Sequence, residues 1–452
     1  MSLSQIAEQL DGELIGRDVV FSNISTDTRA LTKDDLFMAL IGENFDGNNF
    51  IAEAKSQGAA AAIVSRVSEI DLPQLKVSDP HVALGALANL NRKKSAAKVI
   101  ALTGSQGKTT VKEMLGAILN KRADTLITNA NLNNTIGVPL TLLQIEGNHQ
   151  FAVIEMGADK AGEIAFSVSA AEPDIVLITN ASVSHIEGFG SLAGIVSAKG
   201  EIIEGVDEAT GLVLLNADEA HLDVWLELAQ GRRTVLFSQE NKNGNSDYFG
   251  SQISASSYGE MSFTLNSPVG TCEISMQFLG AHNVLNAIAA SAAALEAGAS
   301  LTNVAAGLAN LKPICGRLST ESTKNNCLLI NDTYNASPNS FKAAINVLVS
   351  LSGHKILVVG DMKELGEETD ASHKWVGEYA KRAGVNELFA VGEKSLLTAN
   401  TFGSKGKHFS SRQDLVKACK SLANAETIFL IKGSRGARME YVVNELISAE
   451  ES

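Results

Sequence analysis

One segment constrains this chain more than any other: residues 99–110, VIALTGSQGKTT, lead from an apolar strand pattern through two glycines into a helical pattern. This order is typical of a phosphate-binding loop, because glycines let backbone N–H groups meet phosphate oxygens and a helix N-terminus favours anions. Lys108 is expected to reach the β- and γ-phosphates of a nucleotide, and the Thr109 hydroxyl to bind magnesium. Leu102 stands where the full Walker pattern has its first glycine, so an ordinary tight turn with an exposed lysine is the alternative. The predicted phosphate-binding residues are Gly104, Ser105, Gln106, Gly107, Lys108, Thr109 and Thr110.

Composition and charge narrow the class of protein. The 452 residues are 45% hydrophobic and 19% charged, which predicts compact globular domains, about three by length. A formal charge of −14 argues against a nucleic acid or an anionic membrane surface as partner, since both attract clustered Lys and Arg. The 4 cysteines form no CxxC pair, so no zinc site or disulfide framework is expected. Because neither a signal-like start nor a long apolar run occurs, we expect a soluble, cytoplasmic chain without a membrane span.

Strand and helix patterns alternate along the whole chain and predict an α/β fold in three domains. The pattern of residues 1–97 predicts a small α/β domain with buried strands near 36–40 and 59–64. Residues 98–312 contain the strands KVIALTG, FAVIEMG, DIVLITN and GLVLLN, which predict a parallel sheet covered on both faces. Residues 313–452, beginning at a proline, repeat this pattern and predict a Rossmann-like domain. Ligands of such sheets collect at the carboxyl ends of the strands.

Three polar residues follow strands of the predicted central sheet. Glu155 ends the strand FAVIEMG at the same edge as the phosphate loop and could hold magnesium, or it could be a solvated acid. His185 lies in the loop after the next strand, where a metal or phosphate contact and an ordinary loop histidine are both open. Lys199 is expected on the following helix, either as a functional group or as an exposed helical lysine.

Further polar clusters occur in the second half of the chain. Asn283 and Asn286 lie three residues apart at the start of an alanine-rich helix and thus on one face, where binding and helix capping are equally open. The segment INDTYNASPNS places a dense polar set after a strand: Asp332, Tyr334, Asn335 and Ser337. The segment IKGSRGARME runs from a strand into a helix, and its Lys432, Arg435 and backbone amides predict an anion cradle.

The first domain contains two turn-rich clusters. Ser25-Thr26-Asp27-Thr28-Arg29 and Gly42-Glu43-Asn44-Phe45-Asp46-Gly47 both offer hydroxyls, carboxylates and free N–H groups to a polar ligand. The alternative is that both clusters are ordinary turns that bind no ligand.

In this order, these pieces resemble the Mur ligase family, ATP-dependent enzymes that form amide bonds in bacterial cell-wall synthesis. The resemblance spans essentially the whole chain, and its motifs are TGSQGKTT, the glutamate of VIEMG, SHIEGFGS, SAKGEI, LGAHNVLNA, the arginine of PICGRL, NDTYNASPNS and KGSRGARME. Among the family's branches, NLNNTIGVPLTLL, DTYNASPNS and GDMKELGEE are similar to the ligases that add D-alanyl-D-alanine to UDP-N-acetylmuramoyl-tripeptide. The DNPR-like motif of the ligases that add diaminopimelate or lysine is missing from the third domain.

The resemblance implies a role for each matching residue. Lys108 and its neighbours would bind the ATP phosphates, and two Mg²⁺ ions would be held by Thr109, Glu155, His185 and Lys199, the lysine as a carbamate. Positions around the nucleotide are matched by Asn283, Asn286, Arg317 and Asp332. UDP contacts are implied for Ser25, Asp27, Thr28, Arg29, Asn44, Asp46 and Gly47, and contacts near D-alanyl-D-alanine for Asn335, Ser337, Lys432 and Arg435.

The implied reaction proceeds through an acyl phosphate, which the amine of the dipeptide then attacks. We expect a monomer whose partners are the two small-molecule substrates.

A folylpolyglutamate synthase would share the ATP core, but the amino-terminal extension would then lack a purpose. A nucleotide-switch or motor ATPase is a second alternative and would hydrolyse ATP without an amino acceptor. A non-catalytic scaffold is a third, disfavoured because polar clusters at strand ends would then only reduce stability.

Overall fold

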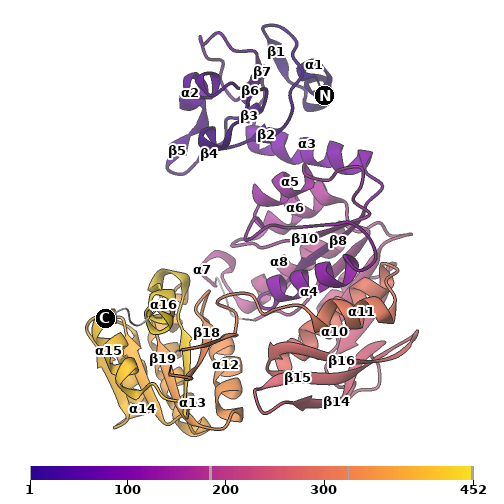
Figure 1. The fold of residues 1–452 in the computed structure, drawn as a ribbon. Coiled ribbons are helices and arrows are strands. Elements are labelled where there is room, and N and C mark those ends of the chain that lie inside the picture. Colours follow the sequence, from indigo (N-terminus) through magenta and orange to yellow (C-terminus); the bar gives the residue numbers. More distant parts are fainter. Residues whose placement is uncertain (1, 183–185, 324, 449–452) are drawn as a thin grey trace.

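The computed structural model describes residues 2–182, 186–323 and 325–448, which form three α/β units along the chain (Figure 1). Each unit is built around its own sheet, of 5, 9 and 6 strands. The predicted boundaries at 97/98 and 312/313 separate these sheets, and we use them to name an N-terminal, a central and a C-terminal domain. The α/β fold expected from the sequence is confirmed. In the described part of the chain, no helix has both the length and the apolar character needed to cross a membrane.

The sheet of the N-terminal domain has the order β1-β7-β6-β3-β2, with β1 antiparallel to β7 and the other neighbours parallel. Both strands expected from the sequence are present, as β3 and β6. A short antiparallel hairpin, β4 and β5, projects beside the sheet. The elements are α1 (Leu3–Leu10), β1 (Glu13–Ile15), β2 (Ile24–Ser25), η1 (Thr28–Ala30), β3 (Leu36–Met38), β4 (Ile41–Gly42), β5 (Phe45–Asp46), η2 (Gly47–Phe50), α2 (Ile51–Ser56), β6 (Ala61–Val64) and β7 (Gln74–Lys76).

Helix α3 (Pro80–Lys94) connects the first two domains. It begins at Asp79, whose carboxylate caps the first turn ahead of a proline, and it ends in three basic residues that suit the negative end of the helix dipole. Leu84 and Leu87 of α3 belong to the core of the N-terminal domain. Asn91 donates to the carbonyl of Leu142 at 2.9 Å in the central domain. The helix therefore packs on both sides of the boundary (Figure 1).

The central sheet has the order β16-β15-β14-β13-β12-β11-β8-β10-β9 and is parallel from β9 to β14. Successive residues of β8 alternate between two cores, since Ile100 and Leu102 face α4 and α10 while Val99 and Ala101 face the opposite layer. This double burial explains the nearly continuous apolar strands. The elements are β8 (Lys98–Thr103), α4 (Lys108–Leu119), β9 (Thr125–Ile127), α5 (Gly137–Leu142), β10 (Phe151–Glu155), α6 (Glu163–Ala171), β11 (Ile175–Ile178), α7 (Ile186–Phe189), α8 (Leu192–Glu204), β12 (Leu212–Asn216), α9 (Leu222–Leu228), β13 (Arg233–Ser238), α10 (Ala281–Glu296) and α11 (Leu301–Ala309).

An antiparallel extension at one edge of this sheet was not foreseen. Strands β14 (Tyr248–Ala255), β15 (Glu260–Ser267) and β16 (Gly270–Leu279) form a meander beneath α10 (Figure 1). In β15 and β16 buried and exposed residues alternate, as expected for strands with one face in solvent.

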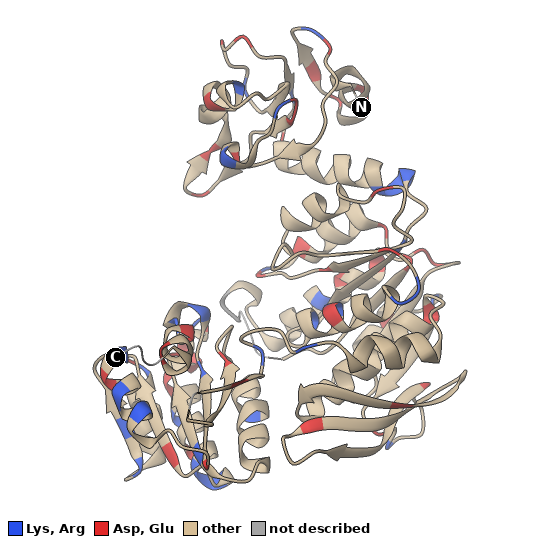
Figure 2. Cartoon of the chain, viewed as in Figure 1, with Lys and Arg blue, Asp and Glu red and all other residues tan. Residues whose placement is uncertain are grey.

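The C-terminal sheet has the order β17-β18-β22-β19-β20-β21, and all neighbours except β17 are parallel. The carboxyl ends of β18, β22 and β19 therefore meet at one edge, which is where ligands of such folds bind. Lys and Arg are interspersed with Asp and Glu in all three domains (Figure 2). The elements are β17 (Ser319–Ser322), β18 (Leu328–Asp332), α12 (Pro338–Ser350), β19 (His354–Val359), η3 (Gly366–Glu368), α13 (Thr369–Ala383), β20 (Glu387–Val391), α14 (Ser395–Phe402), β21 (Gly406–Phe409), α15 (Arg412–Leu422), β22 (Thr427–Lys432), η4 (Arg435–Ala437) and α16 (Glu440–Ile447).

Candidate functional site

The predicted phosphate loop joins β8 to α4 through two glycines with positive φ angles, 150° at Gly104 and 80° at Gly107. A Cβ atom on Gly107 would lie 2.5 Å from Oδ1 of Asn286, and one on Gly104 would collide with the Thr179 hydroxyl. That hydroxyl also donates to the carbonyl of Gln106 at 2.7 Å. The loop is therefore a preformed turn packed against β11 and α10, and it tolerates no side chain at either glycine.

Lys108 is the first residue of α4, and its ammonium donates to the carbonyl of Gly104 at 2.6 Å. Burial lowers the pKa of Lys108 and Arg317 lowers it further, while the carboxylate of Glu155 opposes both effects. Of the remaining loop residues, Ser105 donates its hydroxyl to the Ser182 carbonyl at 3.0 Å and Thr110 is buried. The Lys108 ammonium thus lies across the loop, where phosphate oxygens can replace the carbonyl as acceptor.

Glu155 is the last residue of β10 and is 1% exposed. Its Oε1 accepts hydrogen bonds from the Thr109 hydroxyl at 3.2 Å and from Nδ2 of Asn133 at 2.7 Å. Its Oε2 has no hydrogen-bond partner among the described residues, and Nζ of Lys112 lies 4.0 Å away. An unsatisfied buried oxygen of this kind costs about 1–3 kcal/mol, which a bound cation would offset.

Lys199 lies on α8 as expected, but it is not an exposed helical lysine, because only 3% of the residue is accessible. Burial and, to a smaller extent, the nearby Lys108 lower the pKa of Lys199, acidic groups that include Asp159 oppose this shift, and the resulting pKa is about 7. Its ammonium lies 5.3 Å from the centre of the Phe189 ring. His185 lies outside the described residues. In the described ranges, no three His, Cys, Asp or Glu side chains gather into a group able to hold a metal.

Asn283 and Asn286 lie on one face of α10 and contact each other. Nδ2 of Asn286 donates to Oδ1 of Asn283 at 2.9 Å, and Nδ2 of Asn283 donates to the Leu279 carbonyl at 2.8 Å. The helix N-cap is Gly280, and neither asparagine caps the helix. The capping alternative is therefore wrong, and Asn286 instead faces the phosphate loop at Gly107.

Two direct contacts join the phosphate loop to the C-terminal domain. Nη2 of Arg317 donates to the Thr109 hydroxyl at 2.9 Å, while its guanidinium lies 4.0 Å from the centre of the Tyr334 ring. Nε2 of Gln106 donates to the hydroxyl of Ser337 at 3.1 Å. Residues more than 200 positions apart in sequence thus meet at the start of α4, on the edge where both sheets end.

Lys432 and Asp332 form a buried pair within the C-terminal domain. Nζ of Lys432, which is 1% exposed, donates to Oδ2 of Asp332 at 2.5 Å and to the carbonyl of Asn335 at 2.9 Å. The other oxygen of Asp332 accepts from the backbone N–H of Leu318 at 3.2 Å. The contacts observed for Lys432 are thus internal ones that hold the segment after β18. Its predicted contact with an anionic ligand stays a prediction.

A pocket of about 510 Å³ lies between the central and C-terminal domains. Its central wall includes Thr109 and Lys112 of α4, and its C-terminal wall includes Arg317, Asn335 and residues that follow β19 and β22. The charged residues of the second wall are Arg317, Lys363, Glu364 and Arg435. The first turn of the nucleotide loop therefore faces the strand ends of the second sheet across one cavity.

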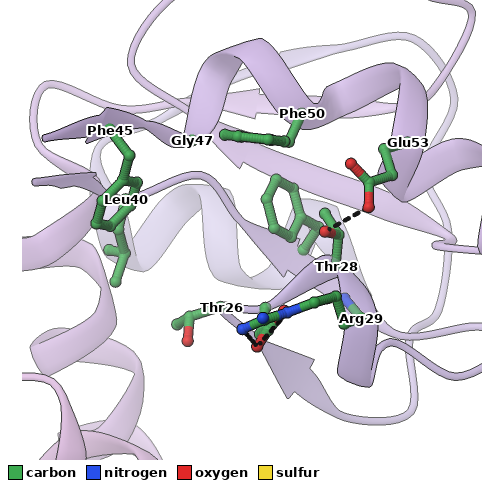
Figure 3. Close-up of a pocket in the computed structure, with 10 residues that line it drawn as sticks. Thr26, Thr28, Arg29, Leu40, Phe45, Gly47, Phe50 and Glu53 are labelled. Atoms are coloured by element: carbon green, nitrogen blue, oxygen red, sulfur yellow. Dashed lines mark hydrogen bonds and ion pairs between the residues drawn. The ribbon is translucent and has the colours of Figure 1, made fainter.

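A second pocket of about 510 Å³ lies in the N-terminal domain (Figure 3). Of the seven residues predicted here, Asp27, Thr28, Arg29 and Gly47 line the cavity, whereas Ser25, Asn44 and Asp46 do not. Arg29 pairs with Asp27 at 2.7 Å, and this hydrogen-bonded pair lowers the pKa of Asp27 to about 2. The two turn-rich clusters of the sequence thus meet at one cavity.

Aromatic side chains complete this N-terminal pocket. Phe45 of β5 is 53% exposed and Phe50 is 40% exposed, and both line the cavity. Figure 3 shows their rings on the side opposite Arg29, with Glu53 accepting a hydrogen bond from Thr28 at 2.9 Å. Exposed phenylalanines beside polar groups suit a ligand that combines a planar ring with charged groups.

Three residues of these sites were missed from the sequence. Asn133 lies in a run of asparagines after β9, and such a polar run at a strand end is the signal that could have revealed it. Lys112 lies one helical turn after Lys108, a spacing that places both on one face of α4. Lys363 lies in a loop after β19, within the segment GDMKELGEE, which marked the family branch without singling out this residue.

The fold and the site define a phosphate-loop enzyme in which a second α/β domain faces the nucleotide loop. The chain belongs to the Mur ligase family. Three family models match it: the Mur ligase family catalytic domain at residues 20–119, the middle domain at 102–294 and the glutamate ligase domain at 316–435.

Individual relatives match over nearly the full length. The chain is 45% identical to the UDP-N-acetylmuramoyl-tripeptide–D-alanyl-D-alanine ligase of Escherichia coli, covering 99% of this chain and 98% of that protein. A crystal structure of MurF from Acinetobacter baumannii superposes with a TM-score of 0.92 at 34% identity, covering 98% of both chains. MurF ligase from Thermotoga maritima in complex with ADP superposes with a TM-score of 0.83 at 27% identity, covering 94% of this chain and 97% of that one.

Proposed function

We propose that this chain is an ATP-dependent ligase that joins D-alanyl-D-alanine to UDP-N-acetylmuramoyl-tripeptide, forming the UDP-muramoyl-pentapeptide of peptidoglycan synthesis. The observation that carries the proposal is the 45% identity, over 99% of the chain, to an enzyme named for this reaction. The match includes the N-terminal domain, which a folate ligase would not need. The contacts of Thr109 and Gln106 with the C-terminal domain also favour a ligase over a switch or motor ATPase, because they close the nucleotide loop against a second substrate domain.

The first chemical step activates a carboxylate. An oxygen of the terminal carboxylate of the tripeptide attacks the γ-phosphorus of ATP, the bond from that phosphorus to the β-phosphate oxygen breaks, and ADP leaves. Lys108 exchanges the Gly104 carbonyl for phosphate oxygens and neutralises part of their charge. Arg317, hydrogen-bonded to Thr109, lies where it can contact the same phosphates. The product of this step is an acyl phosphate.

The second step forms the amide. The free amine of D-alanyl-D-alanine attacks the acyl carbon and loses a proton, and the tetrahedral intermediate collapses as the bond from carbon to the phosphate oxygen breaks, which releases inorganic phosphate. Water must be excluded, since an acyl phosphate hydrolyses readily. The pocket between the central and C-terminal domains supplies this enclosure, and Arg435 enters it from the C-terminal side.

We propose that two magnesium ions bind at this site. The residues present fit the first, since the unsatisfied Oε2 of Glu155 lies on a carboxylate that already contacts the Thr109 hydroxyl. Bound there, magnesium would neutralise charge on phosphate oxygens. His185 and Lys199 would hold the second ion, with Lys199 as a carbamate. A pKa of about 7 keeps a large fraction of Lys199 unprotonated at neutral pH, which is the form that can add carbon dioxide.

The remaining predicted residues are assigned by their positions. The pocket at Arg29 and Phe45 is proposed to bind the uridine diphosphate part of the substrate. Asn283, Asn286 and Asp332 are proposed to lie around the nucleotide, and Asn335 and Ser337 near the dipeptide. We further propose that the protein acts as a monomer, and that it works in the cytoplasm, where its nucleotide substrates are found.

An assay of ADP release tests the proposed function. Purified protein is supplied with ATP and magnesium, and UDP-muramoyl-tripeptide and D-alanyl-D-alanine are added together or singly. The ligase releases ADP at a substantial rate only when both are present, and it forms the pentapeptide in equal amount. ADP release that needs neither substrate, or that needs folate and glutamate instead, would overturn the proposal.

A further inference from the structure

The pocket between the central and C-terminal domains carries an excess of positive charge in a protein whose net charge is −14. Its lining includes four cationic residues and two acidic ones, namely Lys112, Arg317, Lys363, Arg435, Glu113 and Glu364. The amine of a dipeptide has a pKa of about 8, so it enters as an ammonium at neutral pH. The basic groups of the pocket repel such a cation, and a carboxylate is needed to receive it.

Of the two acidic residues, Glu113 lies on the wall where the acyl phosphate is proposed to form. It follows Thr109 by one turn of α4, a spacing that places both side chains on one face of the helix. Glu364 belongs to the opposite wall, in the loop after β19. Because the amine must reach the acyl carbon beside Thr109, it arrives on the side of Glu113.

The carboxylate of Glu113 is held in place by Lys112, which is completely buried. Nζ of Lys112 donates to the carbonyl of Thr128 at 2.7 Å and lies 2.9 Å from Oε1 of Glu113. The Glu113 side chain itself is 35% exposed and lines the pocket. The carboxylate is therefore anchored on one side by a fixed cation and open to a ligand on the other.

Lys112 also limits the distance between Glu113 and Glu155, the proposed magnesium ligand. Nζ of Lys112 lies 4.0 Å from Oε2 of Glu155, the oxygen that has no hydrogen-bond partner among the described residues. Both distances share this nitrogen, so the oxygens of Glu113 and Glu155 are no further apart than 2.9 Å and 4.0 Å combined. An ammonium bound at Glu113 and a phosphoryl group bound beside Glu155 are thus close neighbours.

We propose that Glu113 binds the ammonium of D-alanyl-D-alanine and takes its proton, as the general base of amide formation, an inference that rests on the proposed function. One proton passes from the ammonium to a carboxylate oxygen of Glu113, which frees the lone pair of the nitrogen. That lone pair forms the bond to the acyl carbon, the nitrogen gives a second proton to the phosphate, and the bond from carbon to the phosphate oxygen breaks. A positioned base of this kind contributes about 100- to 10,000-fold to a rate.

Replacing Glu113 by glutamine tests this role, because the change keeps the shape of the side chain and removes its charge. Amide formation with D-alanyl-D-alanine is expected to fall about 100- to 10,000-fold in Glu113→Gln. In a parallel assay the dipeptide is replaced by hydroxylamine, an amine that is neutral at neutral pH and needs no base before it attacks. The variant should form the hydroxamate of UDP-muramoyl-tripeptide at the wild-type rate, because folding and acyl phosphate formation are intact.

A pH profile provides a second readout. Without the base, the variant uses only dipeptide molecules that are already neutral, a fraction that rises about tenfold per pH unit below about pH 8. At subsaturating dipeptide, amide formation by Glu113→Gln should therefore rise about tenfold between about pH 6 and about pH 7. The wild type, which accepts the ammonium, should change much less over this range.

Glu378→Gln, at an exposed position on α13, is the matched control and should behave as the wild type in all three measurements. The assignment is overturned if Glu113→Gln forms the amide at the wild-type rate, or if it loses amide and hydroxamate alike. A loss confined to the amide in Glu364→Gln, and absent from Glu113→Gln, would overturn it as well. A wild type that forms neither the amide nor the hydroxamate would instead contradict the proposed function.

Discussion

At the scale of single residues, we expect the site to depend on Lys108. Its ammonium is held by the carbonyl of Gly104 at 2.6 Å, inside a loop whose two glycines are packed against β11 and α10. Substrate phosphates can take over this hydrogen bond without a change of the backbone. Lys108 is therefore expected to contribute to phosphoryl transfer and not to the folding of the loop.

Replacing Lys108 by alanine tests this role. We expect Lys108→Ala to bind the UDP-tripeptide as tightly as the wild type, because that ligand's proposed uridine pocket lies in the N-terminal domain. ADP formation should fall at least about 100-fold, since one charge that stabilises the transferring phosphoryl group is lost. Titration calorimetry and the ADP assay measure the two effects. Substantial turnover by this variant would contradict the assignment of the phosphate loop.

The residues also show where inference from sequence ends. The loop glycines, Lys108 and the pairing of Thr109 with Glu155 follow from the order of strand, turn and helix, because parallel strands deliver their last residues to one edge. The ion pair of Lys432 cannot be predicted in this way, because its partner Asp332 lies 100 positions away in the sequence. Only the pairing of β18 with β22 brings the two residues together. The contact of Asn133 with Glu155 depends in the same way on the tertiary fold.

At the scale of elements, the start of α10 is a point where two domains meet. His282 in its first turn lies close enough to Asp332 and Lys432 of the C-terminal domain for their charges to act on it. Burial lowers the pKa of His282, Asp332 opposes this shift and Lys432 adds to it, so that the pKa falls from 6.5 to about 4. A positive charge at a helix N-terminus is also unfavourable. The histidine is therefore neutral in the native protein at neutral pH.

The lowered pKa of His282 predicts that the stability of the protein depends on pH. The unfolded chain binds a proton at His282 near pH 6.5 and the native protein only near pH 4, so native stability is full above pH 6.5 and falls as the pH drops toward 4. At about pH 5 the loss from this group amounts to about 2 kcal/mol. Calorimetric unfolding at about pH 7 and about pH 5 should show a smaller acid loss in His282→Gln than in the wild type. Equal losses of unfolding free energy in the two proteins would contradict this role of His282.

Elements differ in how far the sequence reveals them. The parallel strands were foreseen because strands buried on both faces are apolar throughout, as in β8 and β12. The meander of β14, β15 and β16 was not, because only one face is buried and the polar alternation resembles loop composition. The proposed division into three domains accommodates this meander, since it extends the central sheet.

At the scale of the whole molecule, we expect the reaction to depend on closure of the C-terminal domain over the nucleotide loop. The hydrogen bond from Gln106 to Ser337 is a direct link between the loop and that domain. The backbone of Gln106 makes separate hydrogen bonds: its N–H donates to Asn180, and its carbonyl accepts from Thr179, both just after β11. We therefore expect this hydrogen bond to favour closure while the backbone contacts keep the shape of the loop.

Gln106→Ala should weaken closure and let water reach the acyl phosphate. The ratio of ADP released to amide formed is 1 in a fully coupled ligase, and any excess above 1 measures hydrolysis of the intermediate. We expect this excess to be about 2- to 10-fold larger in the variant than in the wild type, the worth of one neutral hydrogen bond. Gln230→Ala, at an exposed position after α9, is the matched control. A coupling ratio that stayed at 1 in Gln106→Ala would show that the link does not contribute to closure.

The most direct test of the central claim follows an oxygen atom. UDP-muramoyl-tripeptide is prepared with oxygen-18 in its terminal carboxylate and converted with ATP and D-alanyl-D-alanine, and the released phosphate is analysed by mass spectrometry. If the carboxylate attacks the γ-phosphorus, one labelled oxygen leaves with the phosphate and the other remains in the new amide. Unlabelled phosphate would show that no acyl phosphate forms and would contradict the mechanism.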